Sequence, residues 1–440
     1  MNRIRYIFNE SGLWSSITTF ITRNHHDVNS VGKLKSYVRD LGKATGNGEI
    51  LQSTHKISTM LESSFSNADK AQSNKFFSGT FSTLSLQLAK LTDHLGENAL
   101  PVDIILQRTN AVQIFTRKFI VLVMFAAFLG LFPKKIFNGQ TPGLGFDGFF
   151  GASRVSGQQL SCLLSYFNIM GDKISSNEQL INDRVVFERH HRVSSTVSFF
   201  TSSKLSLQGT KIIRGYMETY SHGGPLVEAI FANKVVGSST LVNSMHQEEI
   251  LMSVAPETLI ARIFHTDLHS EDVLTFRGLM KYSWYTGFGS SFSYAPIKEE
   301  QMYSSLLRVY ASLDAFSQQS NPRQFTEEYS LRELNKLVPV LCVDFYGEFE
   351  EGKRGPFVTG YWGGGVFGGD IIYKFLIQLI AACVCNREMV FSDAQDRLDY
   401  KKVQSIEQKY KTCGNLAEAF FRTQRQGRFR NGNAIDEMLK

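Results

Sequence analysis

Cysteine is scarce in this chain of 440 residues. Its five cysteines are an odd number, lie far apart for the most part and form no paired CxxC motifs. Disulfide-rich folds and structural zinc sites depend on such paired spacing. We therefore expect neither a disulfide framework nor a zinc site, and a reducing compartment is the simplest interpretation. The five are Cys162, Cys342, Cys383, Cys385 and Cys413.

Long apolar runs are also missing. The strongest run, residues 119–131, is framed by Lys118 and Pro133. It is shorter than the roughly 20 residues that cross a bilayer, so we expect a buried helix and no membrane association. The N-terminus reaches Asn9 and Glu10 before any long apolar stretch, which is unlike a secretory signal.

Neither a strong charge nor a known catalytic motif stands out. The net charge of +6 favours a polyanionic partner without requiring one. The 35 phenylalanines could stack on nucleobases, although they more often fill a core. His265, Asp267 and His269 alternate as metal ligands on a strand edge would, but a loop is the favoured interpretation, and we expect no metal or other cofactor. No nucleophile elbow is present.

The composition suggests three parts. Residues 1–100 are rich in Ser, Thr, Asn and Lys and read as a helical accessory region that is partly flexible at its start, with a leucine-rich helix ending at Gly96. Residues 101–180 read as a helical segment packing on the core, with helices at 119–131 and 158–166. Residues 181–440 read as the main domain.

The third part has an α/β pattern. Short strand-like runs at 185–187, 211–213, 231–236, 338–343 and 389–391 alternate with helical segments, among them 371–385. This alternation predicts an α/β fold whose sheet is covered by helices. The last residues carry Arg422, Arg425, Arg428 and Arg430, which predict a basic, frayed tail; contact with a polyanion is the alternative.

Five glycines crowd into residues 362–370, directly before the apolar helix. Glycine is costly to order, and it lets backbone N–H groups approach a phosphate at a helix N-terminus. The loop therefore predicts a phosphate cradle, with a tight structural turn as the alternative. It matches neither the dinucleotide fingerprint nor the P-loop.

Two adjacent carboxylates, Glu248 and Glu249, follow Gln247 on a predicted helix. Neighbouring residues on a helix point about 100° apart, so these two cannot flank one bond as the acids of an ordinary glycosidase do. One could be a general acid and base while the other positions a sugar. Two solvated surface glutamates are the alternative when the segment is taken alone.

Together these segments resemble the poly(ADP-ribose) glycohydrolase family, which has a three-glycine loop, a short interval, Gln-Glu-Glu and a later glycine-rich diphosphate loop. Here seven residues lie between residues 237–239 and Gln247, and the resemblance extends through 255–260, 285–288 and 359–370. It covers roughly residues 155–400. It implies a macrodomain-like mixed sheet sandwiched by helices, acting on poly(ADP-ribose) or ADP-ribosylated protein.

The resemblance also implies roles for individual residues. Glu249 matches the catalytic glutamate, Glu248 its ribose-binding neighbour and Asn233 an asparagine at the same ribose, while Phe288 stands where a tyrosine stacks on adenine. The family reaction is hydrolysis of ribose–ribose O-glycosidic bonds, releasing ADP-ribose. The other positions implied at the substrate are Gln247, Gly237, Ser238, Ser239, Gly364, Gly365, Val366 and Phe367.

Departures from the family pattern leave two other functions open. Ser238 and Ser239 replace glycines, Ile230 replaces an aspartate, Tyr361 an asparagine and Ala394 an aromatic residue. An ADP-ribose-binding module without turnover is one alternative, and a hydrolase removing single ADP-ribose units from protein side chains is the other. We further expect a monomer without direct nucleic-acid binding, located in the nucleus or cytoplasm, or delivered into a host cell by a pathogen.

Overall fold

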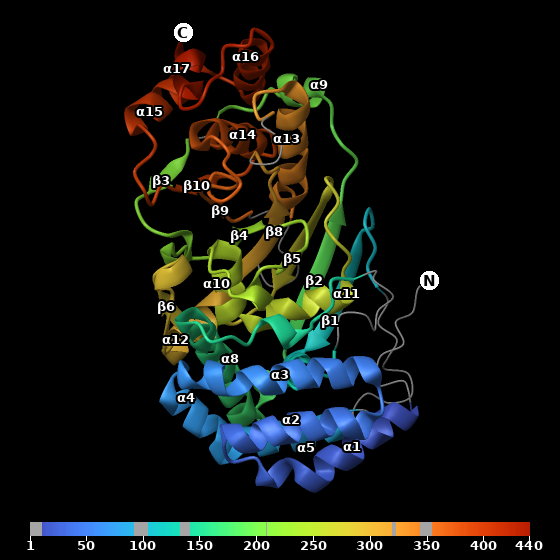
Figure 1. The fold of residues 1–440 in the computed structure, drawn as a ribbon. Coiled ribbons are helices and arrows are strands. Elements are labelled where there is room, and N and C mark those ends of the chain that lie inside the picture. Colours follow the sequence, from blue (N-terminus) through green and yellow to red (C-terminus); the bar gives the residue numbers. More distant parts are fainter. Residues whose placement is uncertain (1–10, 92–103, 133–140, 208, 319–322, 344–353) are drawn as a thin grey trace.

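An eight-stranded mixed β-sheet organises the chain (Figure 1). The computed structural model describes residues 11–91, 104–132, 141–207, 209–318, 323–343 and 354–440. The strand order is β1-β2-β5-β8-β4-β9-β10-β3; β1, β2, β5 and β8 pair antiparallel, and β8, β4, β9, β10 and β3 pair parallel. The strands are β1 Ala111–Thr116, β2 Arg184–His191, β3 Lys211–Ile213, β4 Leu226–Ala232, β5 Asp272–Arg277, β8 Arg308–Asp314, β9 Phe357–Thr359 and β10 Met389–Ser392, with a separate hairpin of β6 Trp284–Thr286 and β7 Ser293–Ala295.

Helices cover both faces of the sheet because the central strands are apolar on both sides. In β4, Val227 and Ala229 join one core cluster, whereas Ile230 and Ala232 join the other. The expected macro-type α/β sandwich is therefore confirmed. One face carries α7 Arg117–Phe128, α8 Arg154–Ser175, α10 Gln247–Val254 and α11 Ala261–Phe264; the other carries α9 Val197–Thr201, α13 Glu327–Leu341, α14 Ile371–Val384, α15 Tyr400–Lys409, α16 Cys413–Arg425 and α17 Ala434–Leu439. The short α12 Glu299–Tyr303 precedes β8.

A layer of helices lies below the sheet in Figure 1. Its first helix buries Trp14, Ile17 and Ile21, so residues from 11 onward pack on the core, and the partly flexible start stays a prediction. This layer shares one continuous core with α7, α8 and α10. Its helices are α1 Ser11–Asn24, α2 Val31–Thr45, α3 Gly48–Ser66, α4 Lys70–Lys75 and α5 Phe81–Ala89. Gly96, the predicted helix stop, lies outside the described residues.

Several predicted elements occur where the sequence placed them, including β2, β3, β10, α7 and α14. Two predictions were wrong. Residues 338–343 lie in and just after α13 rather than in a strand, because a short buried apolar run fits either structure. The strand predicted at 231–236 is β4, which starts at Leu226 and ends at Ala232.

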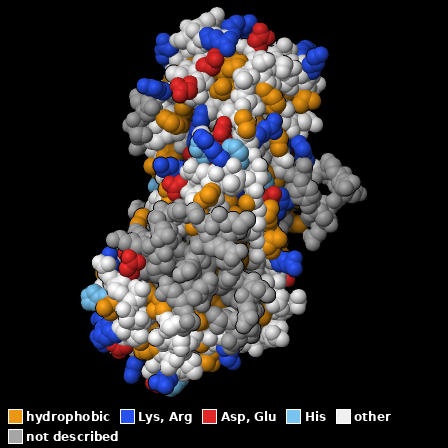
Figure 2. Space-filling view, turned by 90° about the vertical axis from the view of Figure 1, so that its right-hand side faces the viewer, with side chains coloured by type: hydrophobic (Ala, Val, Ile, Leu, Met, Phe, Trp, Pro, Cys, Tyr) orange, Lys and Arg blue, Asp and Glu red, His pale blue; other side chains and the backbone are white. Residues whose placement is uncertain are grey.

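The C-terminal segment is folded, and the prediction of a frayed basic tail was wrong. Phe420 and Phe421 of α16 are buried. Arg425 pairs with Glu327 of α13 at 2.7 Å, and Arg428 pairs with Glu437 of α17 at 2.6 Å. These ion pairs thus connect α16 to α13, and the residues just after α16 to α17. On the face shown in Figure 2, Lys and Arg are dispersed among Asp and Glu rather than gathered into one patch.

The cysteines also depart from expectation, since Cys383 of α14 forms a disulfide with Cys413 of α16 across Cα atoms 5.7 Å apart. The two lie 30 positions apart in sequence, so local spacing gave no sign of the bond. Disulfides persist in oxidising compartments and are rare in the cytosol. The location of the protein therefore stays a prediction.

The segment after α11 is a loop, as favoured from the sequence, and it buries His265. Neither ring nitrogen of His265 has a hydrogen-bond partner within the described ranges. Burial, reinforced by the positive charge of Arg189, lowers its pKa to about 3. Over the same ranges, no group of three or more His, Cys, Asp or Glu side chains could hold a metal ion, and no helix is long and apolar enough to span a bilayer.

Candidate active site

A cavity of about 590 Å³ opens at the carboxyl ends of four parallel strands. Asn233 follows β4, Ala315 follows β8, Gly360 follows β9, and Ser392 ends β10; all four line the cavity. Ligands of open α/β sheets bind in the crevice outside the carboxyl ends of the strands. The strand order alone therefore makes this edge the place for a site.

Gln247 fastens the start of α10 to the sheet. Its Oε1 accepts a hydrogen bond from the Phe231 N–H at 2.8 Å, and its Nε2 donates to the Ala229 carbonyl at 3.2 Å. The backbone pairing between β4 and β9 ends at Glu228. The Gln247 side chain therefore forms hydrogen bonds with the part of β4 that lies beyond this pairing. Gln247 lines the cavity, yet its amide is engaged with the backbone. A direct substrate contact by Gln247 stays a prediction.

Glu248 holds the loop that follows β4. Its Oε1 accepts from the Gly237 N–H at 2.7 Å and its Oε2 from the Asn233 N–H at 3.2 Å. Burial raises the pKa of Glu248 to about 8; the nearby Glu249 adds to the rise, while the two N–H donors and Arg262 oppose it. Each carboxylate oxygen can accept a further bond, so a sugar hydroxyl could still donate to Glu248.

Glu249 is held by one oxygen only. Its Oε2 accepts from the His246 N–H at 2.9 Å, just before the helix begins. No described residue donates a hydrogen bond to Oε1, although the side chain is only 5% exposed and lines the cavity. The two glutamates thus differ in their contacts: Glu248 accepts hydrogen bonds through both oxygens, whereas Glu249 accepts one through Oε2 alone among the described residues.

The loop at residues 237–239 accommodates its serines. Only Gly237 has a positive φ, +68°, and a Cβ there would lie 2.8 Å from the Met252 Sδ. Ser239 has an ordinary φ of −88° and lines the cavity, whereas Ser238 does not line it. The backbone therefore requires glycine at one position of the three, and the serine at 239 changes the cavity wall rather than the path of the chain.

The glycine loop, residues 362–370, also lines the cavity. The Gly369 N–H donates to the Gly363 carbonyl at 2.9 Å and closes the base of the loop. At its tip, the N–H groups of Gly365, Val366 and Phe367 donate to no described residue, and all three residues line the cavity with Gly364. Successive unpaired N–H groups form an anion-binding surface. The Asp370 side chain caps α14 by accepting from the Tyr373 N–H at 2.7 Å.

An aromatic pair stands at the cavity wall. The ring of Phe288 lies 5.0 Å from the ring of Tyr216, which is half exposed, and both line the cavity. The backbone joins this wall to the glutamates, since the Gly289 N–H donates to the Met245 carbonyl at 2.8 Å. A planar group entering the cavity would meet these rings.

The other departures from the family pattern lie in different surroundings. Ile230 is fully buried in the core and does not line the cavity. Tyr361 does line it, and its hydroxyl donates to the Asp393 carboxylate, which fastens the glycine loop to the segment after β10. Ala394, in that segment, also lines the cavity. Of these three residues, Tyr361 and Ala394 are therefore the ones that can contact a ligand in the cavity.

Sequence reasoning missed part of the lining. Ala315 could have been found as the residue after a parallel strand, had β8 been recognised. The segment containing Tyr216 lies between short elements and has no periodicity that would mark it. The residues missed include Tyr216, Met217, Glu218, Ser244, His246, Ala315, Ile371, Ser392 and Gln395.

Two protein-family models match the chain. The family model for the macro domain fold of poly(ADP-ribose) glycohydrolase matches residues 199–399, and the model for the helical domain of the same enzymes matches residues 68–189. The chain belongs to the poly(ADP-ribose) glycohydrolase family. The macro-domain match contains the cavity-lining residues described above.

Individual glycohydrolases are similar to the chain at low identity. Poly(ADP-ribose) glycohydrolase 2 of Caenorhabditis elegans is 27% identical over 191 residues, which cover 40% of this chain and 39% of that protein. Poly(ADP-ribose) glycohydrolase 1 of Arabidopsis thaliana is 24% identical over 336 residues, 60% of each. The chain spans between 26% and 60% of the length of these and two further relatives.

Proposed function

We propose that this protein hydrolyses ribose–ribose O-glycosidic bonds in poly(ADP-ribose) and releases ADP-ribose. The observation that carries the proposal is that one cavity is lined both by buried Glu248 and Glu249 of α10 and by residues 365–367, whose N–H groups donate to no described residue. A carboxylate acid and base suits a glycosidic bond, and the N–H groups suit a diphosphate. Membership in the family supports the same substrate.

In this proposal Glu249 carries the proton. Its free Oε1, when protonated, donates the proton to the departing ribose oxygen as the bond to the anomeric carbon breaks, and the distal ribose gains oxocarbenium character. The resulting carboxylate then takes a proton from the attacking water, whose oxygen bonds to the anomeric carbon. Glu249 ends protonated, ready for another cycle. Its fixed Oε2 keeps the carboxyl group oriented throughout.

The remaining walls hold the substrate. Glu248 and Asn233 accept from ribose hydroxyls, the glycine-loop N–H groups donate to the diphosphate, and the ring of Phe288 packs against adenine. Positioning of this kind is a large part of a glycosidase's rate, because the bond must meet the acid at hydrogen-bond distance.

The test is release of ADP-ribose from labelled polymer by the purified protein. Glu249→Gln should lower the rate at least about 100-fold, because it removes the proton carrier while keeping the shape. ADP-ribose affinity, measured by calorimetry, should change little. The matched control is Glu418→Gln on the exposed surface of α16, which should behave as wild type. Wild type without turnover would contradict the enzymatic proposal.

One observation favours a second candidate. Ser239 lines the cavity where the family pattern has glycine, which could allow ADP-ribose to bind without turnover. ADP-ribose binding by wild type without release from polymer or from mono-modified protein would select this binding module. Release from mono-modified protein alone would select a hydrolase of single ADP-ribose units.

A further inference from the structure

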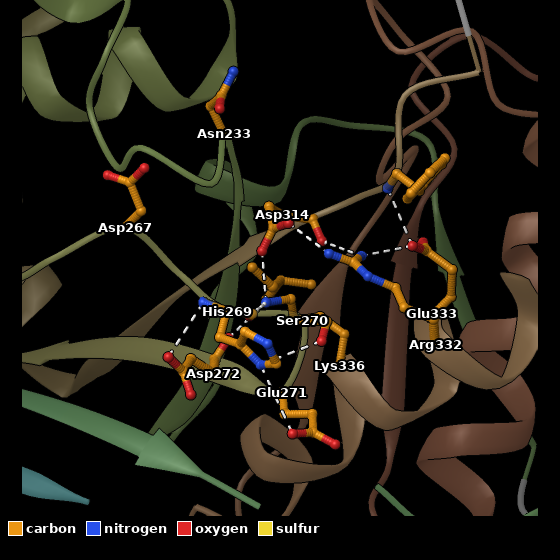
Figure 3. A network of polar contacts seen from close by, with 12 residues as sticks. Asn233, Asp267, His269, Ser270, Glu271, Asp272, Asp314, Arg332, Glu333 and Lys336 are labelled. Atoms are coloured by element: carbon orange, nitrogen blue, oxygen red, sulfur yellow. Dashed lines mark hydrogen bonds and ion pairs between the residues drawn. The ribbon is translucent and has the colours of Figure 1, made fainter. Parts of the chain in front are cut away.

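A chain of buried ion pairs lies at the carboxyl end of β8, beside the cavity. Asp314, which ends β8, pairs with Arg332 and Lys336 of α13, each at 2.5 Å. Arg332 also pairs with Glu333 at 2.7 Å, and Glu333 pairs with Lys374 of α14. Figure 3 shows Arg332 between the carboxylates of Asp314 and Glu333. The pairs join two helices to the strand end from which Ala315 enters the cavity wall.

Lys374 reaches the base of the glycine loop. A Cβ on Gly363 would lie 3.0 Å from the Lys374 Nζ, and a Cβ on Gly369 would lie 3.4 Å from its Cε. The ammonium group also lies 4.0 Å from the ring centroid of Trp362, whose indole N–H donates to the Leu313 carbonyl at 3.1 Å. Lys374 therefore supports the loop directly at the two glycines that close it.

The charges in this chain of ion pairs do not cancel. Arg332, Lys336 and Lys374 are three cations, and Asp314 and Glu333 are two carboxylates, which leaves an excess of one positive charge. The next carboxylate beyond Lys336, that of Asp272, has a cationic partner of its own in Arg189, and the Nδ1 of His191 lies 3.0 Å from it.

The excess charge is shielded from water. Lys374 is 1% exposed and Lys336 is fully buried. Burial lowers the pKa of Lys374, and the contact with Glu333 opposes that shift. Charges in such surroundings act over several ångströms with little screening by salt. An anion on the free N–H groups of residues 365–367 would bind to the same loop whose base contacts Lys374.

We propose that Lys374 makes the glycine loop selective for anionic ligands, because its ammonium group supplies the unbalanced positive charge beneath the loop. Lys374 is a positioning residue, since the loop backbone separates it from the ligand. The inference rests on the proposed function, in which the diphosphate of ADP-ribose occupies the loop. It adds the source of the charge that N–H groups alone do not provide.

The test compares a charged and a neutral ligand on four proteins. Affinities for ADP-ribose and adenosine are measured by calorimetry for wild type, Lys374→Met, Glu333→Gln and the double variant. The excess positive charge is one in wild type and in the double variant, none in Lys374→Met and two in Glu333→Gln. Lys374→Met should bind ADP-ribose about tenfold more weakly, a loss typical of removing one poorly screened charge.

The same variant should bind adenosine as wild type does, since adenosine carries no charge. Glu333→Gln should bind ADP-ribose severalfold more tightly, and the double variant should recover most of the loss. Equal losses for ADP-ribose and adenosine would show a change of loop shape and overturn the inference. Unchanged ADP-ribose affinity in Lys374→Met would overturn it as well.

Two results separate this inference from the function on which it rests. If wild type does not bind ADP-ribose, the proposed function fails and the inference fails with it. If wild type binds ADP-ribose but the affinities of the variants do not change with their excess positive charge, only the inference fails. Should Lys374→Met not fold because buried Glu333 loses one of its two cationic partners, Glu333→Gln decides: tighter ADP-ribose binding supports the inference, and unchanged or weaker binding overturns it.

Discussion

Replacing Gly365 by alanine should leave the fold intact and weaken ligand binding. A Cβ on Gly365 would meet no heavy atom within 4 Å, and its φ lies outside the left-handed region. Alanine at such a position reduces the freedom of the unfolded chain, so the free energy of unfolding should stay the same or rise by up to about 1 kcal/mol. The protein itself therefore does not require glycine there.

The control is alanine at Gly363, two residues earlier in the same loop. Its φ is +71°, and a Cβ would lie 2.6 Å from the Ala315 Cβ and 2.9 Å from the Lys374 Cε. The left-handed conformation costs a residue with a Cβ about 1–2 kcal/mol, and overpacking costs about 1–3 kcal/mol. Gly363→Ala should thus lose roughly 2–5 kcal/mol of unfolding free energy.

Urea unfolding measures both stabilities, and calorimetry with ADP-ribose measures the affinity of Gly365→Ala. A methyl group beside the free N–H groups should keep a phosphate from approaching. Losing one hydrogen bond to a charged group costs about 1.5–3 kcal/mol, so affinity should fall roughly 10- to 100-fold. Unchanged affinity, or a destabilisation as large as that of Gly363→Ala, would refute the role of this glycine at the ligand.

Two further predictions concern stability. His265 has a folded pKa of about 3 against 6.5 for the ordinary group, so the unfolded chain binds more protons between these values and stability falls as pH decreases through that window. Between about pH 6.5 and about pH 4 this histidine should cost the wild type about 3 kcal/mol of unfolding free energy, and His265→Phe should not lose that amount. Urea unfolding at several pH values measures this, and an equal dependence of stability on pH in the two proteins would contradict it. Cys413→Ser should cost about 3–4 kcal/mol, because the disulfide closes a loop of 30 residues. Thiol titration of unfolded wild type should find three free thiols, and finding five would contradict the bond.

Sequence patterns predicted the elements that are periodic and locally specified. The apolar run of residues 119–131 and the run after Asp370 each form a buried helix, because a long apolar stretch has few other stable forms. The short run at 338–343 gave the wrong element. A run of six apolar residues is compatible with a buried strand and with a buried helix, and only packing against α14 decides between them.

The candidate site likewise has features that the sequence predicts and features that depend on the fold. The adjacency of Gln247, Glu248 and Glu249, and the crowding of glycines at 362–370, are properties of the chain itself. Family motifs could assign them roles before any fold was known. The unequal hydrogen bonding of the two glutamates could not be foreseen, because it depends on backbone N–H groups that the loop after β4 brings to Glu248.

By itself, then, the sequence determined the fold class, the family and the residue types at the candidate site, since local periodicity and motif spacing encode these. Only the tertiary structure decided what lies beside them. It paired Cys383 with Cys413, packed the C-terminal helices and set Lys374 beneath the glycine loop. Each of these contacts joins separate elements, and their meeting depends on how the sheet and its helices pack rather than on any local pattern.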